Sequence, residues 1–176
     1  MLTRRSLLMN ATALAVAAPR PSFAQEPAPT ILKLRRRTIE VNGKAASVLG
    51  IERNGGVQGL TTQVGDRFRV RVENELNEPS LVHWHGLTPP WREDGVAFVS
   101  GPPIPAGGKA DYDFPLTFGG TYWMHSHYGL QEQALMDAPL IILQPGRDED
   151  RQEIVVTLND FSFTPARQIF ASLISS

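Results

Sequence analysis

All four histidines of this 176-residue chain lie in two copies of one short pattern, His-x-His: His83 with His85, and His125 with His127. In a β-strand, residues i and i+2 point to the same face, so each pair presents two imidazoles with Cα atoms ~6–7 Å apart. Two such strands brought together would form a cluster of four imidazoles. A single pair is often a surface or structural feature. Two pairs with no histidine elsewhere favour a metal site.

The residue types near these pairs narrow the choice of metal. Imidazole nitrogen suits copper, zinc, iron and nickel. The chain has no cysteine, which excludes disulfides, thiolate nucleophiles, Cys-ligated zinc, Fe–S clusters and a blue-copper centre of the His₂Cys type. No carboxylate is obvious beside either pair. An all-imidazole site therefore favours copper or zinc.

The elements that must position the histidines look like short strands. Residues 66–76 alternate apolar and polar side chains, as a half-buried strand does. Asn42-Gly43-Lys44 is a hairpin turn signal between two further alternating runs, 38–41 and 46–49. Other strands are expected at 81–85, 110–114, 121–127 and 138–143, and one short helix at 130–135. Strands separated by turn signals at this spacing predict a β-sandwich or barrel.

The first residues have the features of an export signal. Two arginines at positions 4 and 5 precede an apolar run at 11–18, and Ser22-Phe23-Ala24 provides small residues at a cleavage site. We interpret 1–24 as a twin-arginine signal peptide, which predicts the periplasm of a bacterium. The apolar run is too short for a membrane anchor, which needs ~20 residues, so no membrane span is expected in the mature chain.

The rest of the chain divides into three parts. Residues 25–31 form a Pro/Ala linker, 32–146 one β domain, and 147–176 the start of a second domain. The second unit holds an apolar run at 154–158 that is expected to be a strand. Such a short unit either adds a strand to the first domain or belongs to a domain cut short by the end of the chain, and we favour the latter. The formal net charge of −1 gives no electrostatic reason to expect nucleic acid as a partner.

The motifs around the histidines resemble those of the multicopper oxidase family. The matching segments, in order, are His83-Trp84-His85-Gly86, Asp94-Gly95, Ile104-Pro105, Gly120-Thr121-Tyr122-Trp123-Met124-His125-Ser126-His127 and Gln131. They look like the first domain of a laccase-like bacterial member. The resemblance implies an all-β, cupredoxin-like Greek-key sandwich or barrel of the plastocyanin-like type.

The resemblance also implies roles for individual residues. His83 matches a ligand of the type 2 copper, and His85, His125 and His127 match ligands of the type 3 copper pair. Asp94 matches the acid that helps to deliver protons during reduction of O₂ to water, although an Asp before a glycine is also a common turn residue. The implied partners are O₂ and an unknown electron donor, either a phenol or cuprous ion.

The chain departs from the family pattern in two respects. It carries two His-x-His pairs where the family has four, and it lacks the cysteine of the type 1 copper. We therefore expect the chain to supply half of a trinuclear copper cluster, completed by another chain or by missing C-terminal domains, and to be inactive as an oxidase alone. The alternatives are a non-catalytic periplasmic copper-binding module and, less well supported, a Cu/Zn enzyme of the superoxide dismutase type.

Overall fold

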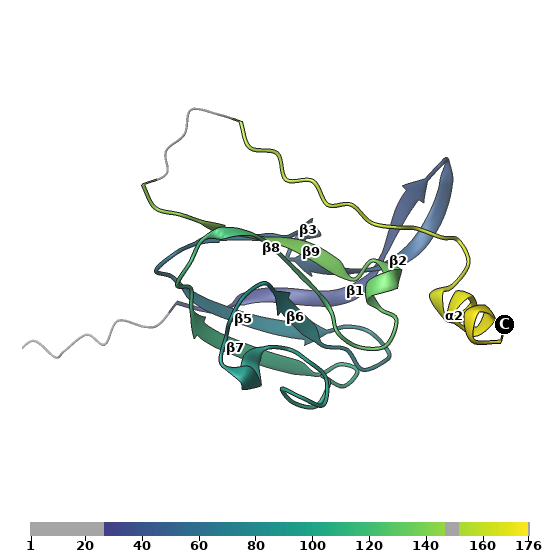
Figure 1. Cartoon of the computed structure of the whole chain (residues 1–176), viewed down its shortest axis with the longest axis horizontal. Coiled ribbons are helices and arrows are strands. Elements are labelled where there is room, and N and C mark those ends of the chain that lie inside the picture. The colour runs from purple at the N-terminus through teal and green to yellow at the C-terminus, as the bar shows by residue number, and fades with distance from the viewer. Residues whose placement is uncertain (1–26, 147–151, 176) are drawn as a thin grey trace, which may run out of the picture.

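The computed structural model describes residues 27–146 and 152–175 as two packed β-sheets followed by an extended segment and a helix (Figure 1). The predicted signal peptide, the first residues of the predicted linker and residues 147–151 lie outside the described residues. The first sheet has the strand order β3-β2-β1-β5-β7. Its strands are β1 (Thr30–Val41), β2 (Lys44–Arg53), β3 (Val57–Gln58), β5 (Arg67–Asn74) and β7 (Lys109–Pro115).

The second sheet has the order β4-β9-β8-β6. Its strands are β4 (Leu60–Gln63), β6 (Val82–His85), β8 (Gly120–Ser126) and β9 (Asp137–Leu143). Strands β1 and β5 pair in parallel, as do β4 and β9, and the remaining pairs are antiparallel. Between β5 and β8 the chain passes from one sheet to the other at each strand. The predicted all-β Greek-key sandwich is therefore confirmed.

Local sequence accounts for much of this arrangement. Asn42 and Gly43 have φ angles of 51° and 75°, the positive values that a tight hairpin turn requires, and they join β1 to β2 as predicted. In β5 the predicted alternation holds, because Phe68, Val70 and Val72 are buried while the arginines between them are not. The short helix expected at 130–135 is the 3-10 turn η2 (Glu132–Ala134), and a second such turn, η1 (Trp91–Glu93), follows β6.

The main hydrophobic core fills the space between the sheets. Trp84 of β6 is fully buried within it, with its ring centroid 4.7 Å from that of Phe68 and 5.0 Å from that of Tyr112. These partners belong to the opposite sheet, so the indole joins the two layers. Burial of such a side chain contributes at least ~1.5–3 kcal/mol. The strand that carries the first histidine pair is thus fixed by its own central residue.

The structure differs from the sequence prediction at both ends of the domain. Strand β1 begins at Thr30, so the extended part starts before the predicted linker ends. The strand predicted at 154–158 does not form: Ile154, Val156 and Leu158 are 74%, 71% and 91% exposed. An apolar run becomes a strand only where a neighbouring edge accepts its backbone hydrogen bonds, and no strand within 27–146 or 152–175 pairs with this run.

The C-terminal segment ends in helix α2 (Ala166–Ile174), which has no buried residue. Before this helix, Phe161 packs beside Ala46, Val48 and Leu135 of the β domain. None of the helices in the two described ranges is long and apolar enough to cross a bilayer.

Candidate metal centre

The two His-x-His pairs lie on adjacent antiparallel strands, β6 and β8, with His83 directly opposite His125. Neighbouring residues in both strands, including Trp84 and Met124, point into the core. Because side chains alternate along a strand, the imidazoles lie on the outer face of the sheet. His127 follows β8 directly, and its backbone N–H donates to the carbonyl of Leu81 over 3.2 Å, which keeps the second pair in the ladder.

All four imidazoles are brought together. The centroid of the His83 ring lies 5.6 Å from that of His85, 5.5 Å from that of His125 and 5.6 Å from that of His127. The His85–His125 and His125–His127 centroid distances are 5.4 and 6.1 Å. Every predicted histidine therefore belongs to one cluster, formed by pairs separated by about forty residues in the chain.

Three of these side chains have spacing suited to a metal ion. Candidate ligand nitrogens of His83, His85 and His125 all lie within 4.8 Å of one another. His85 Nδ1 and His125 Nε2 are only 3.3 Å apart. Two bonds of ~2.0 Å at a tetrahedral angle place two ligand nitrogens ~3.3 Å apart, so this pair has the separation of imidazoles that share one ion.

Backbone carbonyls fix which nitrogen of two rings is available. His83 Nδ1 lies 2.7 Å from the carbonyl oxygen of Asp94, and His125 Nδ1 lies 3.0 Å from that of Ser126. A carbonyl oxygen only accepts, so each neutral ring donates from Nδ1–H and keeps the lone pair of Nε2 for a metal ion. Such contacts orient metal-binding histidines in general.

His125 is the most enclosed of the four rings. Burial lowers the pKa of His125, although the Ser126 carbonyl and the carboxylate of Glu132 act in the opposite direction. The ring is therefore neutral near pH 7, the form that binds metals. Trp123 stacks on it, with centroids 4.1 Å apart and planes 19° apart.

Glu132 is a carboxylate that sequence reasoning missed. Its Oε2 lies 3.1 Å from His125 Nδ1, and its side chain is 41% exposed. The turn η2 brings it back onto the cluster, because Gln131 is anchored inside the fold. The Gln131 side chain accepts from the hydroxyls of Ser80 and Ser126 over 2.7 and 2.8 Å and donates to the carbonyl of Pro79 over 2.9 Å.

Asp94 lies at the edge of the cluster rather than inside it. Its backbone carbonyl meets His83, while its carboxylate Oδ1 is 3.5 Å from the same ring nitrogen and one third of the side chain is exposed. The next residue, Gly95, has φ 73°, and a Cβ there would lie 1.8 Å from the carbonyl oxygen of Val82. Only glycine permits this approach, which brings the turn against β6.

The two-sheet β-sandwich is cupredoxin-like, and four imidazoles gather on one outer face of it. The chain belongs to the multicopper oxidase family, since the model of that family, described as "Multicopper oxidase", matches residues 33–147. The resemblance found in the sequence is thereby confirmed.

Similar proteins support this placement. The chain is 36% identical to a "Copper resistance protein A homolog" of Pseudomonas syringae pv. tomato over 74% of this chain and 23% of that protein. It is 33% identical to "Laccase-2" of Thanatephorus cucumeris, covering 78% of this chain and 24% of the laccase. The crystal structure of a multi-copper oxidase from Pseudomonas Thermotolerans superposes with a TM-score of 0.60 at 32% identity, over 65% of this chain and 29% of that one.

These relatives are much longer than the chain. It spans about a quarter of the length of the copper resistance protein and the laccase. Activities of the whole relatives therefore do not transfer to it directly.

Proposed function

We propose that this chain supplies half of the trinuclear copper cluster of a multicopper oxidase. The observation that carries the proposal is the approach of candidate ligand nitrogens from His83, His85 and His125 to within 4.8 Å of one another. By their place in the family motif, His83 would bind the type 2 copper, and His85, His125 and His127 the type 3 pair. The short His85–His125 distance supports one shared ion for those two rings.

The donor set suits copper in both oxidation states. Neutral imidazole binds copper well, and the chain has no thiolate to compete. When bound, a cluster of copper ions supplies electrons for the reduction of O₂ to water. The chain's own residues orient the imidazoles through the carbonyls of Asp94 and Ser126. The partly exposed carboxylate of Asp94 is suited to pass protons between solvent and the cluster.

The rest of the site lies outside these 176 residues in this proposal. The imidazoles occupy an outer sheet face, and both His85 and His127 are exposed. A further domain or a completing chain would cover this face with the remaining histidines and provide the type 1 copper. Residues 32–146 would be the first cupredoxin domain and 147–176 the beginning of the second. Export by the twin-arginine route would place the protein in the periplasm.

The electron donor is not specified by the residues present, and phenols and cuprous ion both remain candidates. A non-catalytic copper-binding module is the alternative function, and the exposure of two of the four imidazoles favours it as a second candidate. Both functions require the same ligands and predict no turnover by the chain alone, so they separate only by turnover in the presence of the completing domains or chain.

An oxidase assay tests the half-site proposal. We expect the purified, copper-loaded chain to show no aerobic oxidation of a phenolic dye above that of a variant with all four histidines replaced by alanine, because no thiolate-bound copper can accept electrons from the dye. Oxygen uptake and dye absorbance would be followed together. Sustained turnover that depends on the histidines would contradict the proposal.

A further inference from the structure

The turn that carries Asp94 is held from two sides, and one of its anchors is a side chain with no assigned role. We infer that Glu93 is a positioning residue, whose carboxylate fixes the turn that orients the His83 imidazole. The inference deepens the proposed function, on which its copper readout rests. It concerns the three residues 93–95, between β6 and β7.

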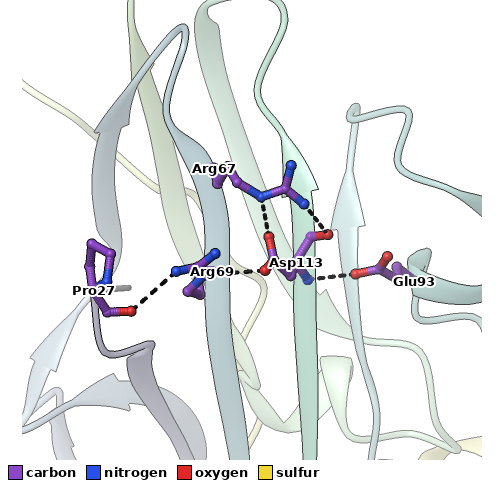
Figure 2. Close-up of polar contacts among 5 residues, drawn as sticks. All are labelled: Pro27, Arg67, Arg69, Glu93 and Asp113. Carbon is purple, nitrogen blue, oxygen red and sulfur yellow. Dashed lines mark hydrogen bonds and ion pairs between the residues drawn. The ribbon is translucent and has the colours of Figure 1, made fainter. Parts of the chain in front are cut away.

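The first anchor joins the turn to β7. The backbone N–H of Asp113 donates to Glu93 Oε2 over 2.6 Å (Figure 2). Strand β7 is an edge of the five-stranded sheet, and among the strands that the structure describes it pairs with β5 alone. An edge strand leaves N–H groups without a strand partner. The Glu93 carboxylate accepts from one such N–H. This hydrogen bond joins the turn to the five-stranded sheet, which does not carry the histidines.

The acceptor strand is itself well fixed at this point. The Asp113 carboxylate accepts from Arg67 Nε over 2.5 Å and from Arg69 Nε over 3.1 Å (Figure 2). These arginines lie on β5, so Asp113 is held against its neighbouring strand. The two ion pairs lower the pKa of Asp113, Arg67 being the larger cause, and keep it ionised at neutral pH. Glu93 thus binds to a rigid part of the sheet.

The second anchor joins the same turn to β6. The indole Nε1–H of Trp84 donates to the Glu93 carbonyl over 3.0 Å, and the next carbonyl, of Asp94, accepts from His83 over 2.7 Å. Gly95 then lies against the backbone of β6. Three consecutive residues therefore contact the strand of the first histidine pair.

The geometry gives Glu93 a distinct task. Both β6 and β7 are edge strands, of different sheets, and the turn crosses between them. Without the Glu93 carboxylate the turn would keep its contacts to β6. It would lose the hydrogen bond from the Asp113 N–H, which fixes its position relative to β7. The Asp94 carbonyl would then move relative to His83, and the Nδ1–H bond that keeps Nε2 free for copper would weaken.

Three variants test this inference in the purified chain. Glu93→Ala removes the acceptor, whereas Glu93→Gln keeps an oxygen that can accept from the same N–H. Arg92→Ala is the matched control, since Arg92 is the neighbour of Glu93 and its guanidinium lies over the exposed Trp91 ring, 4.6 Å from the ring centroid. Cu²⁺ affinity would be measured against a chromophoric chelator, and the His83 Nδ1–H signal by ¹⁵N NMR of the copper-free chain.

We expect Glu93→Ala to weaken Cu²⁺ binding about 10-fold or more, as loss of groups that orient ligands does elsewhere, and to broaden the His83 Nδ1–H signal through exchange with water. Glu93→Gln and Arg92→Ala should match the wild-type chain in both measurements. A wild-type signal and affinity in Glu93→Ala, or a Glu93→Gln variant as impaired as Glu93→Ala, would overturn the inference. If the wild-type chain bound no copper, the proposed function would fail, and the NMR comparison would still decide the role of Glu93.

Discussion

Replacing His125 with alanine should lower the affinity of the chain for copper by about 100-fold or more, beyond the range typical of losing a group that only orients a ligand. His125 contributes to the three-nitrogen group and lies closest to His85, with which it has the spacing of a shared ion. Burial lowers the pKa of His125 and keeps its ring neutral, so a copper ion does not have to displace a proton from it. Equilibrium dialysis with metal analysis, or competition with a Cu⁺ or Cu²⁺ chelator, would measure the loss.

His127→Ala provides the matched comparison. His127 has the same motif and lies on the same sheet face, but it is not part of the three-nitrogen group. We expect this variant to keep the tightest-bound copper ion and to lose only a weaker one. For the chain alone, without the completing ligands of the proposed cluster, we take the tightest copper site to be the three-nitrogen group of His83, His85 and His125. Equal losses in His125→Ala and His127→Ala would contradict that assignment.

Replacing Trp84 with alanine should destabilise the folded domain by about 3–5 kcal/mol, the usual cost of removing a buried aromatic ring. The indole is fully buried, contacts the opposite sheet through Phe68 and Tyr112, and donates a hydrogen bond to the Glu93 carbonyl. Its loss would also free the strand that holds His83 and His85. Urea denaturation of the copper-free chain, followed by circular dichroism, measures the change in free energy of unfolding.

Two further variants sharpen the Trp84 result. Trp84→Phe keeps most of the apolar volume but loses the N–H donor, so we expect a smaller loss that includes ~1 kcal/mol for the hydrogen bond. Trp91→Ala is the control, because Trp91 is 60% exposed and should matter by no more than ~0.5 kcal/mol. A Trp84→Ala variant as stable as Trp91→Ala would show that the indole does not join the sheets.

The part of the site that could be predicted from sequence follows from the two-residue period of a strand. That period places His83 with His85 and His125 with His127 on shared faces, whatever the rest of the fold does. The alternation in 66–76 likewise predicts β5, and Asn42-Gly43 predicts the turn between β1 and β2. These features are local, and the structure has them as expected.

The features that could not be predicted depend on contacts between distant residues. Glu132 follows the second pair in the sequence, yet it meets His125 because Gln131 is anchored by Ser80, 51 residues earlier, as well as by Ser126 and Pro79. The carboxylate of Glu93 meets β7 because the turn after β6 reaches the edge strand of the other sheet, where it accepts from the Asp113 N–H. The apolar run at 154–158 has strand-forming residues but no strand partner, and propensity alone does not supply one.

Copper stoichiometry with electron paramagnetic resonance of the purified chain tests the central claim most directly. Four imidazoles and no thiolate predict at least one tightly bound Cu²⁺ ion per chain, with a type 2 signal and without the intense blue absorption of a copper–thiolate bond. The signal should disappear in the variant that lacks all four histidines. The account would be contradicted if the wild-type chain bound copper no more tightly than that variant does, or if the type 2 signal survived the loss of the histidines.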